Sequence, residues 1–254
     1  MLPKVRFREM TLEENIEIIK WSYFEKDESL DIHNYTIQLF PSLQDIDNNL
    51  SKEKVYKIIE NIVTKVYENN KETIKKEVKR YNKIWNKYND IYFESLYNYL
   101  NTKIDNIKII YASIGIIPVS PRYLDTYSFS TTINLNDKDI IAITAHETLH
   151  FMWFNKWKEL YPDCKRYEYD TPYLAWKYSE MVTDPILNSK EIKNILNIDE
   201  KAYDSFYTIK DNNTSMMANL INIYNKDQSI EEKIKEGYEY IKKVLEKTKW
   251  LLYF

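Results

Sequence analysis

The residues of this chain that are best suited to chemistry lie in the short segment His146-Glu147-Thr148-Leu149-His150. On a helix, which turns by about 100° per residue, the two histidines lie about 40° apart and one turn from each other. Two imidazoles with this spacing can bind one metal ion. The carboxylate of Glu147 falls within the same arc, where it can reach a water molecule on the metal. The spacing therefore predicts a metal site that uses two of the chain's three histidines.

The surroundings of this motif help to decide between a metal site and an ordinary protein core. From Ile140 to Trp157 the chain is apolar on nearly every side, which predicts a buried central helix. The alternative interpretation is a pair of core histidines that are satisfied by backbone or carboxylate partners. Three ionisable groups buried in such a helix without partners would cost several kcal/mol. A metal ion removes this cost, so we favour the metal site.

A catalytic zinc ion needs a third protein ligand and an open position for water. The remaining histidine, His33, lies far upstream in an ambiguous segment, and we expect it to be an ordinary surface or core residue. A downstream carboxylate is the natural third ligand, and the candidates are Glu159, Asp163, Glu168, Asp170, Glu180 and Asp184. Glu180 lies in a predicted helix that begins after Pro172 and is apolar on one face. Asp184 is one turn further on that face, where it could accept the second ring N–H of a ligand histidine.

The HExxH motif followed by Glu180 and Asp184 as an ExxxD pattern resembles the zincin metallopeptidases, and more narrowly the gluzincin group. This resemblance implies that His146, His150 and Glu180 bind a zinc ion. It also implies that Glu147 is the general base, which activates a zinc-bound water to hydrolyse peptide bonds. The chain is then expected to be a zinc metallopeptidase, a hydrolase acting on a peptide or protein substrate. The alternative is a catalytically inactive zincin that binds zinc and serves as a regulatory or interaction protein.

The resemblance also suggests how a substrate is held. The oxyanion is expected to be stabilised by a tyrosine or arginine, because no histidine lies downstream of His150. The tyrosine candidates are Tyr169, Tyr173, Tyr203, Tyr207, Tyr238 and Tyr240. The strand predicted over Tyr127–Leu135 lies just before the zinc helix, where related enzymes hold an extended substrate, and its edge could pair with peptide backbone.

The element pattern predicts an α+β protein that is predominantly helical, with a small β-sheet packed beside the buried HExxH helix. Thr11 with Glu14, and Ser229 with Glu232, form capping boxes that start helices. Other helices are expected over 51–66 and 71–100 and after Pro162, and residues 31–40 are ambiguous between strand and helix. The three expected strands cover 107–113, 116–119 and 127–135. We expect a helical N-terminal region over 1–103 and a zincin-like catalytic region over 104–254.

Composition and charge narrow the possible partners. The net charge of −3 gives no electrostatic case for nucleic acid or an anionic membrane, and two glycines exclude glycine-rich phosphate loops. No apolar run is long enough for a membrane span, and no signal peptide is visible. With Cys164 as the single cysteine, these features predict a cytoplasmic protein. A second alternative is that residues 71–100, rich in Lys and Tyr, bind single-stranded nucleic acid, but nearby glutamates dilute their charge.

Overall fold

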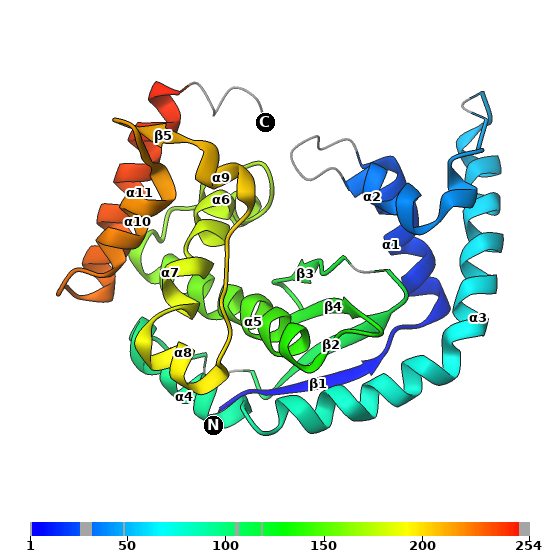
Figure 1. Ribbon diagram of the computed structural model, residues 1–254, viewed down its shortest axis with the longest axis horizontal. Coiled ribbons are helices and arrows are strands. Elements are labelled where there is room, and N and C mark those ends of the chain that lie inside the picture. The colour runs from blue at the N-terminus through cyan, green and yellow to red at the C-terminus, as the bar shows by residue number, and fades with distance from the viewer. Residues whose placement is uncertain (1, 26–31, 48, 105–106, 118, 249–254) are drawn as a thin grey trace. The chain divides into compact units, whose positions relative to one another are not determined.

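The computed structural model describes residues 2–25, 32–47, 49–104, 107–117 and 119–248, and Figure 1 shows the course of the chain. These residues form two compact units. The first, here called the sheet unit, comprises the described residues of Val5–Ile84 and Ile109–Asp137. The second, here called the helical unit, comprises the described residues of Met1–Lys4, Trp85–Lys108 and Lys138–Phe254.

A four-stranded mixed sheet with the order β1-β2-β4-β3 forms the sheet unit's framework. β2 runs parallel to β4, and β3 runs antiparallel to β4. Side chains alternate between the two faces, so that Val5 and Phe7 of β1 are buried while their neighbours are more exposed. The strands are β1 (Lys4–Glu9), β2 (Ile109–Gly115), β3 (Arg122–Tyr123) and β4 (Ser128–Thr132).

Helices complete the sheet unit and supply most of its apolar core. They are α1 (Leu12–Phe24), α2 (Ile32–Leu39), the 3-10 turn η1 (Pro41–Leu43) and α3 (Lys52–Trp85). The predicted capping box is confirmed, because the Thr11 hydroxyl accepts from the Glu14 backbone N–H while the Glu14 carboxylate accepts from that of Thr11. Ile19, Ile59 and Val63 are fully buried in one cluster where α1 packs on α3.

Several elements of the sheet unit differ from the sequence-based expectations. The ambiguous segment forms helix α2. The helix expected over 51–66 and the first half of the helix expected over 71–100 are joined in one long helix, α3, and a separate helix covers Asn89–Leu100. The helix continues because residues 67–70 contain no glycine or proline and Tyr67 extends the buried stripe. Strand β1 was not expected. The described residues of 116–119 form no strand, and residue 118 lies outside the described part of the chain.

The expected substrate-binding strand is also corrected. β4 is shorter than predicted and lies between β2 and β3. Phe129 and Ser128 pair with β3, and the backbone N–H of Ser130 donates to the carbonyl of Pro121 at 3.0 Å. The backbone of β4 is therefore already paired along this stretch and is not a free edge there.

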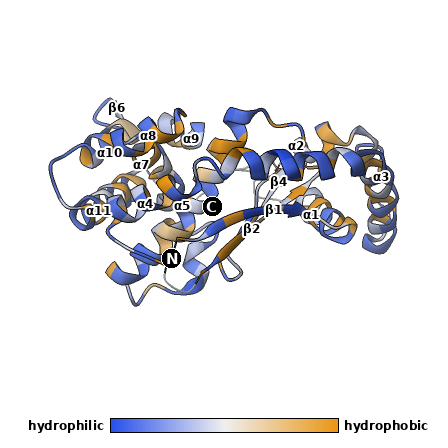
Figure 2. Ribbon diagram, turned by 90° about the horizontal axis from the view of Figure 1, so that it is seen from below, coloured by the Kyte–Doolittle hydropathy of each residue, from blue (hydrophilic) through white to orange (hydrophobic). Residues whose placement is uncertain are grey.

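The helical unit is built around α5 (Asp137–Leu160), which carries the HExxH motif. The remaining elements are α4 (Asn89–Leu100), η2 (Arg166–Tyr169), α6 (Leu174–Met181), α7 (Thr183–Leu187), α8 (Lys190–Leu196), α9 (Asp204–Thr208), β5 (Lys210–Asp211), β6 (Thr214–Ser215), α10 (Met216–Tyr224) and α11 (Ile230–Lys247). The predicted capping box at Ser229 and Glu232 is confirmed at the start of α11. α11 carries both hydrophilic and hydrophobic residues, as expected of a helix that covers a core (Figure 2).

The central part of α5 is buried, as its apolar sequence predicts. Trp153 and Trp157 stack with their ring centroids 4.9 Å apart, and Tyr178 of α6 meets Trp153 edge-on at 5.5 Å. On another side, the hydroxyl of Tyr92 in α4 donates to the carbonyl of Ala145 at 2.7 Å. This packing fixes the turn of α5 that presents the two histidines.

The fold class expected from the sequence is confirmed at the level of α+β, with mostly helix and a small mixed sheet. The two compact units do not follow the boundary expected between residues 103 and 104. The sheet groups with the N-terminal helices, and α4 groups with the C-terminal helices. The packing of the sheet beside the HExxH helix stays a prediction. Within the described residues, no helix is long and apolar enough to cross a membrane.

Candidate metal centre

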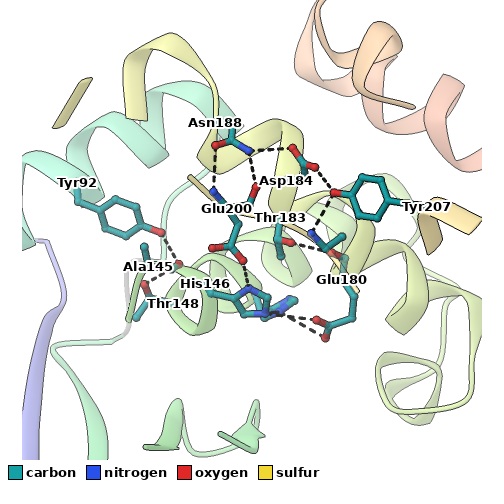
Figure 3. Close-up of polar contacts among 12 residues, drawn as sticks. Tyr92, Ala145, His146, Thr148, Glu180, Thr183, Asp184, Asn188, Glu200 and Tyr207 are labelled. Atoms are coloured by element: carbon teal, nitrogen blue, oxygen red, sulfur yellow. Dashed lines mark hydrogen bonds and ion pairs between the residues drawn. The ribbon is translucent and has the colours of Figure 1, made fainter. Parts of the chain in front are cut away.

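His146 and His150 lie on one face of α5, as the spacing predicts (Figure 3). Their Nε2 atoms are 3.0 Å apart and their ring centroids are 4.7 Å apart. His150 is fully buried, whereas the side chain of His146 is 21% exposed. The pair therefore presents two ring nitrogens to a single point near the protein surface.

Glu180 brings a carboxylate to the same point from α6. Its Oε2 atom is 3.4 Å from Nε2 of His146, and its Oε1 atom is 3.5 Å from Nε2 of His150. Glu180 is 1% exposed, so its charge is removed from solvent. Across the described part of the chain, these three residues are the group of His, Cys, Asp and Glu side chains placed to hold a metal ion.

The distances between these donor atoms fit a tetrahedral zinc ion. With bonds of about 2.0–2.1 Å, two ligand atoms of a tetrahedral zinc lie about 3.3 Å apart. The observed separations bracket this value: the two Nε2 atoms are 3.0 Å apart, and they lie 3.4 and 3.5 Å from the Oε2 and Oε1 atoms of Glu180, respectively. Two imidazole nitrogens and one carboxylate are also a donor set of catalytic zinc sites, in which a fourth position is left for water or substrate. The residues present therefore fit the ion that the sequence predicts.

Glu200 contacts the other nitrogen of the His146 ring, with its Oε1 atom 2.8 Å from Nδ1. This residue lies in the segment between α8 and α9, and its side chain is 12% exposed. A carboxylate at Nδ1 keeps the proton on that nitrogen and leaves Nε2 free to bind a metal ion. Sequence reasoning missed Glu200, because it lies in a loop outside both motifs and only the folded chain brings it to the histidine.

Asn188 holds Glu200 in position through its backbone. The amide of Asn188 accepts from the Glu200 N–H at 3.1 Å and donates to the Glu200 carbonyl at 2.8 Å. The same Asn188 NH₂ group donates to Asp184 at 2.9 Å, and Tyr207 donates its hydroxyl to the other oxygen of Asp184. Figure 3 shows this chain of contacts running from His146 through Glu200 and Asn188 to Asp184 and Tyr207.

Asp184 does not take the position expected for it beside a ligand histidine. The expected continuous helix ends at Met181, Val182 separates it from α7, and Pro185 follows Asp184. Asp184 consequently contacts Asn188 and Tyr207, and Glu200 contacts His146 in its place. Asp184 is therefore separated from the imidazole by two residues, Asn188 and Glu200, where the sequence suggested direct contact.

The electrostatics of the group favour a bound cation. Burial opposes the charged form of His146, but hydrogen bonds to Glu180 and Glu200 outweigh it and hold the pKa of this imidazole well above its usual value. Glu147, which is 6% exposed, raises the same pKa through its charge. Three carboxylates thus surround two imidazoles, so the group attracts positive charge.

The other candidates for the third ligand lie apart from this group. Glu159 pairs with Lys156, Asp170 pairs with Arg166, and Glu168 accepts from the backbone of Lys165. Asp163 also lies outside the group. His33 belongs to α2 in the sheet unit, where its ring contacts the backbone carbonyl of Tyr23.

The candidate tyrosines have varied surroundings. The hydroxyl of Tyr207 is directed to Asp184, and that of Tyr240 accepts from Asn219. Tyr169 stacks on Phe154 at 4.5 Å, and Phe154 in turn stacks on His150 at 6.4 Å. Tyr238 packs among the aromatic rings around Trp157, while Tyr173 and Tyr203 are exposed. The oxyanion donor stays a prediction.

Comparison with protein-family models, with curated proteins and with solved structures finds no match to this chain.

Proposed function

We propose that this chain is a zinc-dependent metallopeptidase with a zincin-like catalytic region of the gluzincin kind. The observation that carries the proposal is the convergence of His146, His150 and Glu180, in which the two Nε2 atoms are 3.0 Å apart and each lies 3.4–3.5 Å from one oxygen of the Glu180 carboxylate. These separations suit one tetrahedral ion, and the first two residues come from a single helical turn that also carries Glu147.

The residues have distinct proposed roles. His146, His150 and Glu180 hold the zinc ion, and Glu200 fixes the orientation of the His146 ring. A bound zinc ion supplies Lewis acidity, which lowers the pKa of a water molecule and polarises a peptide carbonyl.

Glu147 acts on the proton of the attacking water. Its carboxylate takes that proton as the water oxygen bonds to the carbonyl carbon. It then passes the proton to the amine nitrogen as the carbon–nitrogen bond breaks. A structural metal site has no use for a carboxylate beside the first ligand. The presence of Glu147 therefore supports a peptidase over the alternative, an inactive zinc-binding regulatory or interaction protein.

The test compares metal content and hydrolysis in matched variants. Purified protein is expected to bind about one zinc ion, measured by elemental analysis, and to cleave members of a mixed peptide library, measured by mass spectrometry. Glu147→Gln should retain zinc and lose hydrolysis. Glu191→Gln, on the exposed side of α8, serves as the control and should retain both.

Other results would count against parts of the proposal. Full activity in Glu147→Gln would reject the assigned base. Zinc binding without hydrolysis in the unaltered chain would support the inactive alternative. Absence of zinc binding would reject the site itself.

A further inference from the structure

The sheet unit contains a pocket of about 1050 Å³, and every residue that lines it belongs to that unit. Its walls come from α1 and from one face of the sheet. The volume is slightly above the range typical of sites for small molecules, about 300–1,000 Å³. None of the predicted metal ligands lines it.

Aromatic side chains are the first feature of the pocket that points to a ligand. Trp21 of α1, Tyr111 of β2 and Tyr123 of β3 all line it, and each is 44% exposed. Large aromatic residues that remain exposed around one hollow are typical of binding sites. Their ring faces carry partial negative charge and attract cations.

Acidic residues are the second feature. Glu13, Glu14 and Glu17 line the pocket together with a single basic residue, Arg8. Arg8 is already neutralised, because its guanidinium pairs with both carboxylate oxygens of Glu14, at 3.0 and 2.5 Å. Glu17 pairs with Lys20 at 3.0 Å, but its side chain is 72% exposed. Within the described part of the chain, Glu13 forms no ion pair. The lining is therefore negative overall.

A buried hydroxyl is the third feature. Ser113 of β2 lines the pocket and is 5% exposed. Ser128 and Ser130 of β4 line the same pocket. A hydroxyl at the pocket wall can accept a hydrogen bond from a ligand that donates one.

We propose that this pocket binds a peptide segment that carries arginine or lysine side chains. A guanidinium or ammonium group offers only hydrogen-bond donors, which match the carboxylate and hydroxyl acceptors, and it stacks favourably on aromatic rings. The negative lining disfavours an anionic ligand. A neutral sugar would use the rings and hydroxyls but not the carboxylate charges, and a single small cation would leave most of the volume unused. This inference does not rest on the proposed peptidase activity.

The experiment titrates the full chain with the blocked peptide Ac-Ala-Arg-Ala-Arg-Ala-amide in a calorimeter. Binding with a dissociation constant below about 1 mM is expected, and it should weaken as salt is raised because screening reduces the attraction. Mass spectrometry after the titration verifies that the peptide is intact. The glutamine analogue of the peptide and the neutral sugar maltotriose are titrated in parallel.

Trp21 and Glu13 line the pocket at exposed positions, so we expect their replacement to leave the fold unchanged. Trp21→Ala should weaken peptide binding by about 3- to 30-fold, the loss expected for one cation–π contact, and Glu13→Gln should also weaken it. Tyr167→Ala and Glu246→Gln, at exposed positions of the helical unit, are the matched controls and should bind as the unaltered chain does.

Three results would overturn the proposal. They are equal binding of the glutamine analogue, tighter binding of maltotriose than of the arginine peptide, and unchanged affinity in both pocket variants. Circular dichroism of each variant establishes that a loss of binding does not reflect a loss of fold.

Discussion

Replacement of Glu200 offers the sharpest test of the metal centre, because its role comes from the structure and not from either sequence motif. In Glu200→Ala, Nδ1 of His146 loses the carboxylate that lies 2.8 Å away. When a histidine that binds a metal ion loses the carboxylate on its other ring nitrogen, metal affinity falls by about 10- to 100-fold, which corresponds to about 1.4–2.7 kcal/mol. We expect zinc affinity to fall by that factor.

Glu200→Gln should have a smaller effect. The amide oxygen can still accept the proton of Nδ1, but the hydrogen bond is no longer assisted by charge and loses about half its strength. We therefore expect about a fivefold loss of affinity, from a change of about 1 kcal/mol in the hydrogen bond.

The assay is a competition titration at pH 7 between the protein and a chromophoric zinc chelator. Glu191→Ala, on a nearby exposed helix, is the control and should bind zinc as the unaltered chain does. Asp184→Ala is included because the sequence alone placed Asp184 beside the histidine. Unchanged affinity in Glu200→Ala, or a larger loss in Asp184→Ala than in Glu200→Ala, would refute the role assigned to Glu200.

Further predictions concern stability and reactivity. Gly237→Ala should destabilise the protein in thermal unfolding despite the better helix propensity of alanine, because the added Cβ would lie 2.3 Å from the hydroxyl of buried Tyr178; an unchanged midpoint would contradict this. Burial opposes ionisation of Glu231, but hydrogen bonds, chiefly from Lys156, outweigh it and lower its pKa. Its contribution to stability should therefore be present at neutral pH and be lost as pH falls through the lowered pKa, and Glu231→Gln should flatten that part of an acid unfolding curve. Burial raises the pKa of Cys164 to about 11, so its alkylation by iodoacetamide should be slow at pH 8 and should accelerate towards pH 10; rapid modification at pH 8 would exclude this.

The sequence predicted the part of the candidate metal centre that depends on local geometry. The helical repeat alone places His146 and His150 on one face, and the structure places their nitrogens 3.0 Å apart. Glu180 was one of six downstream carboxylates considered, and its place in a predicted helix and in the ExxxD pattern with Asp184 distinguished it. Pro185 already disfavours helix at Asp184 in the sequence, but the contacts of Asp184 with Asn188 and Tyr207 depend on the folded chain.

Features that depend on distant parts of the chain were not predictable. Glu200 lies in a loop with no periodicity, and its position follows from hydrogen bonds to Asn188. Strand β1 has an alternating pattern too short to stand out, and it is defined by its place beside β2. The length of α3 was underestimated because the apolar residues identified in the sequence stopped at Val66 and resumed at Ile74, whereas buried Tyr67 continues the stripe.

The candidate metal centre draws on three separate stretches of the chain, namely α5, α6 and the segment containing Glu200. An ion held there would cross-link α5 to α6 through its three ligands, and Glu200 would tie its own segment to α5 through the ring of His146. Since only the folded chain assembles the ligands, occupancy would raise resistance to unfolding in proportion to the logarithm of free zinc concentration. The thermal midpoint of this protein would then serve as a gauge of how much zinc is available to it.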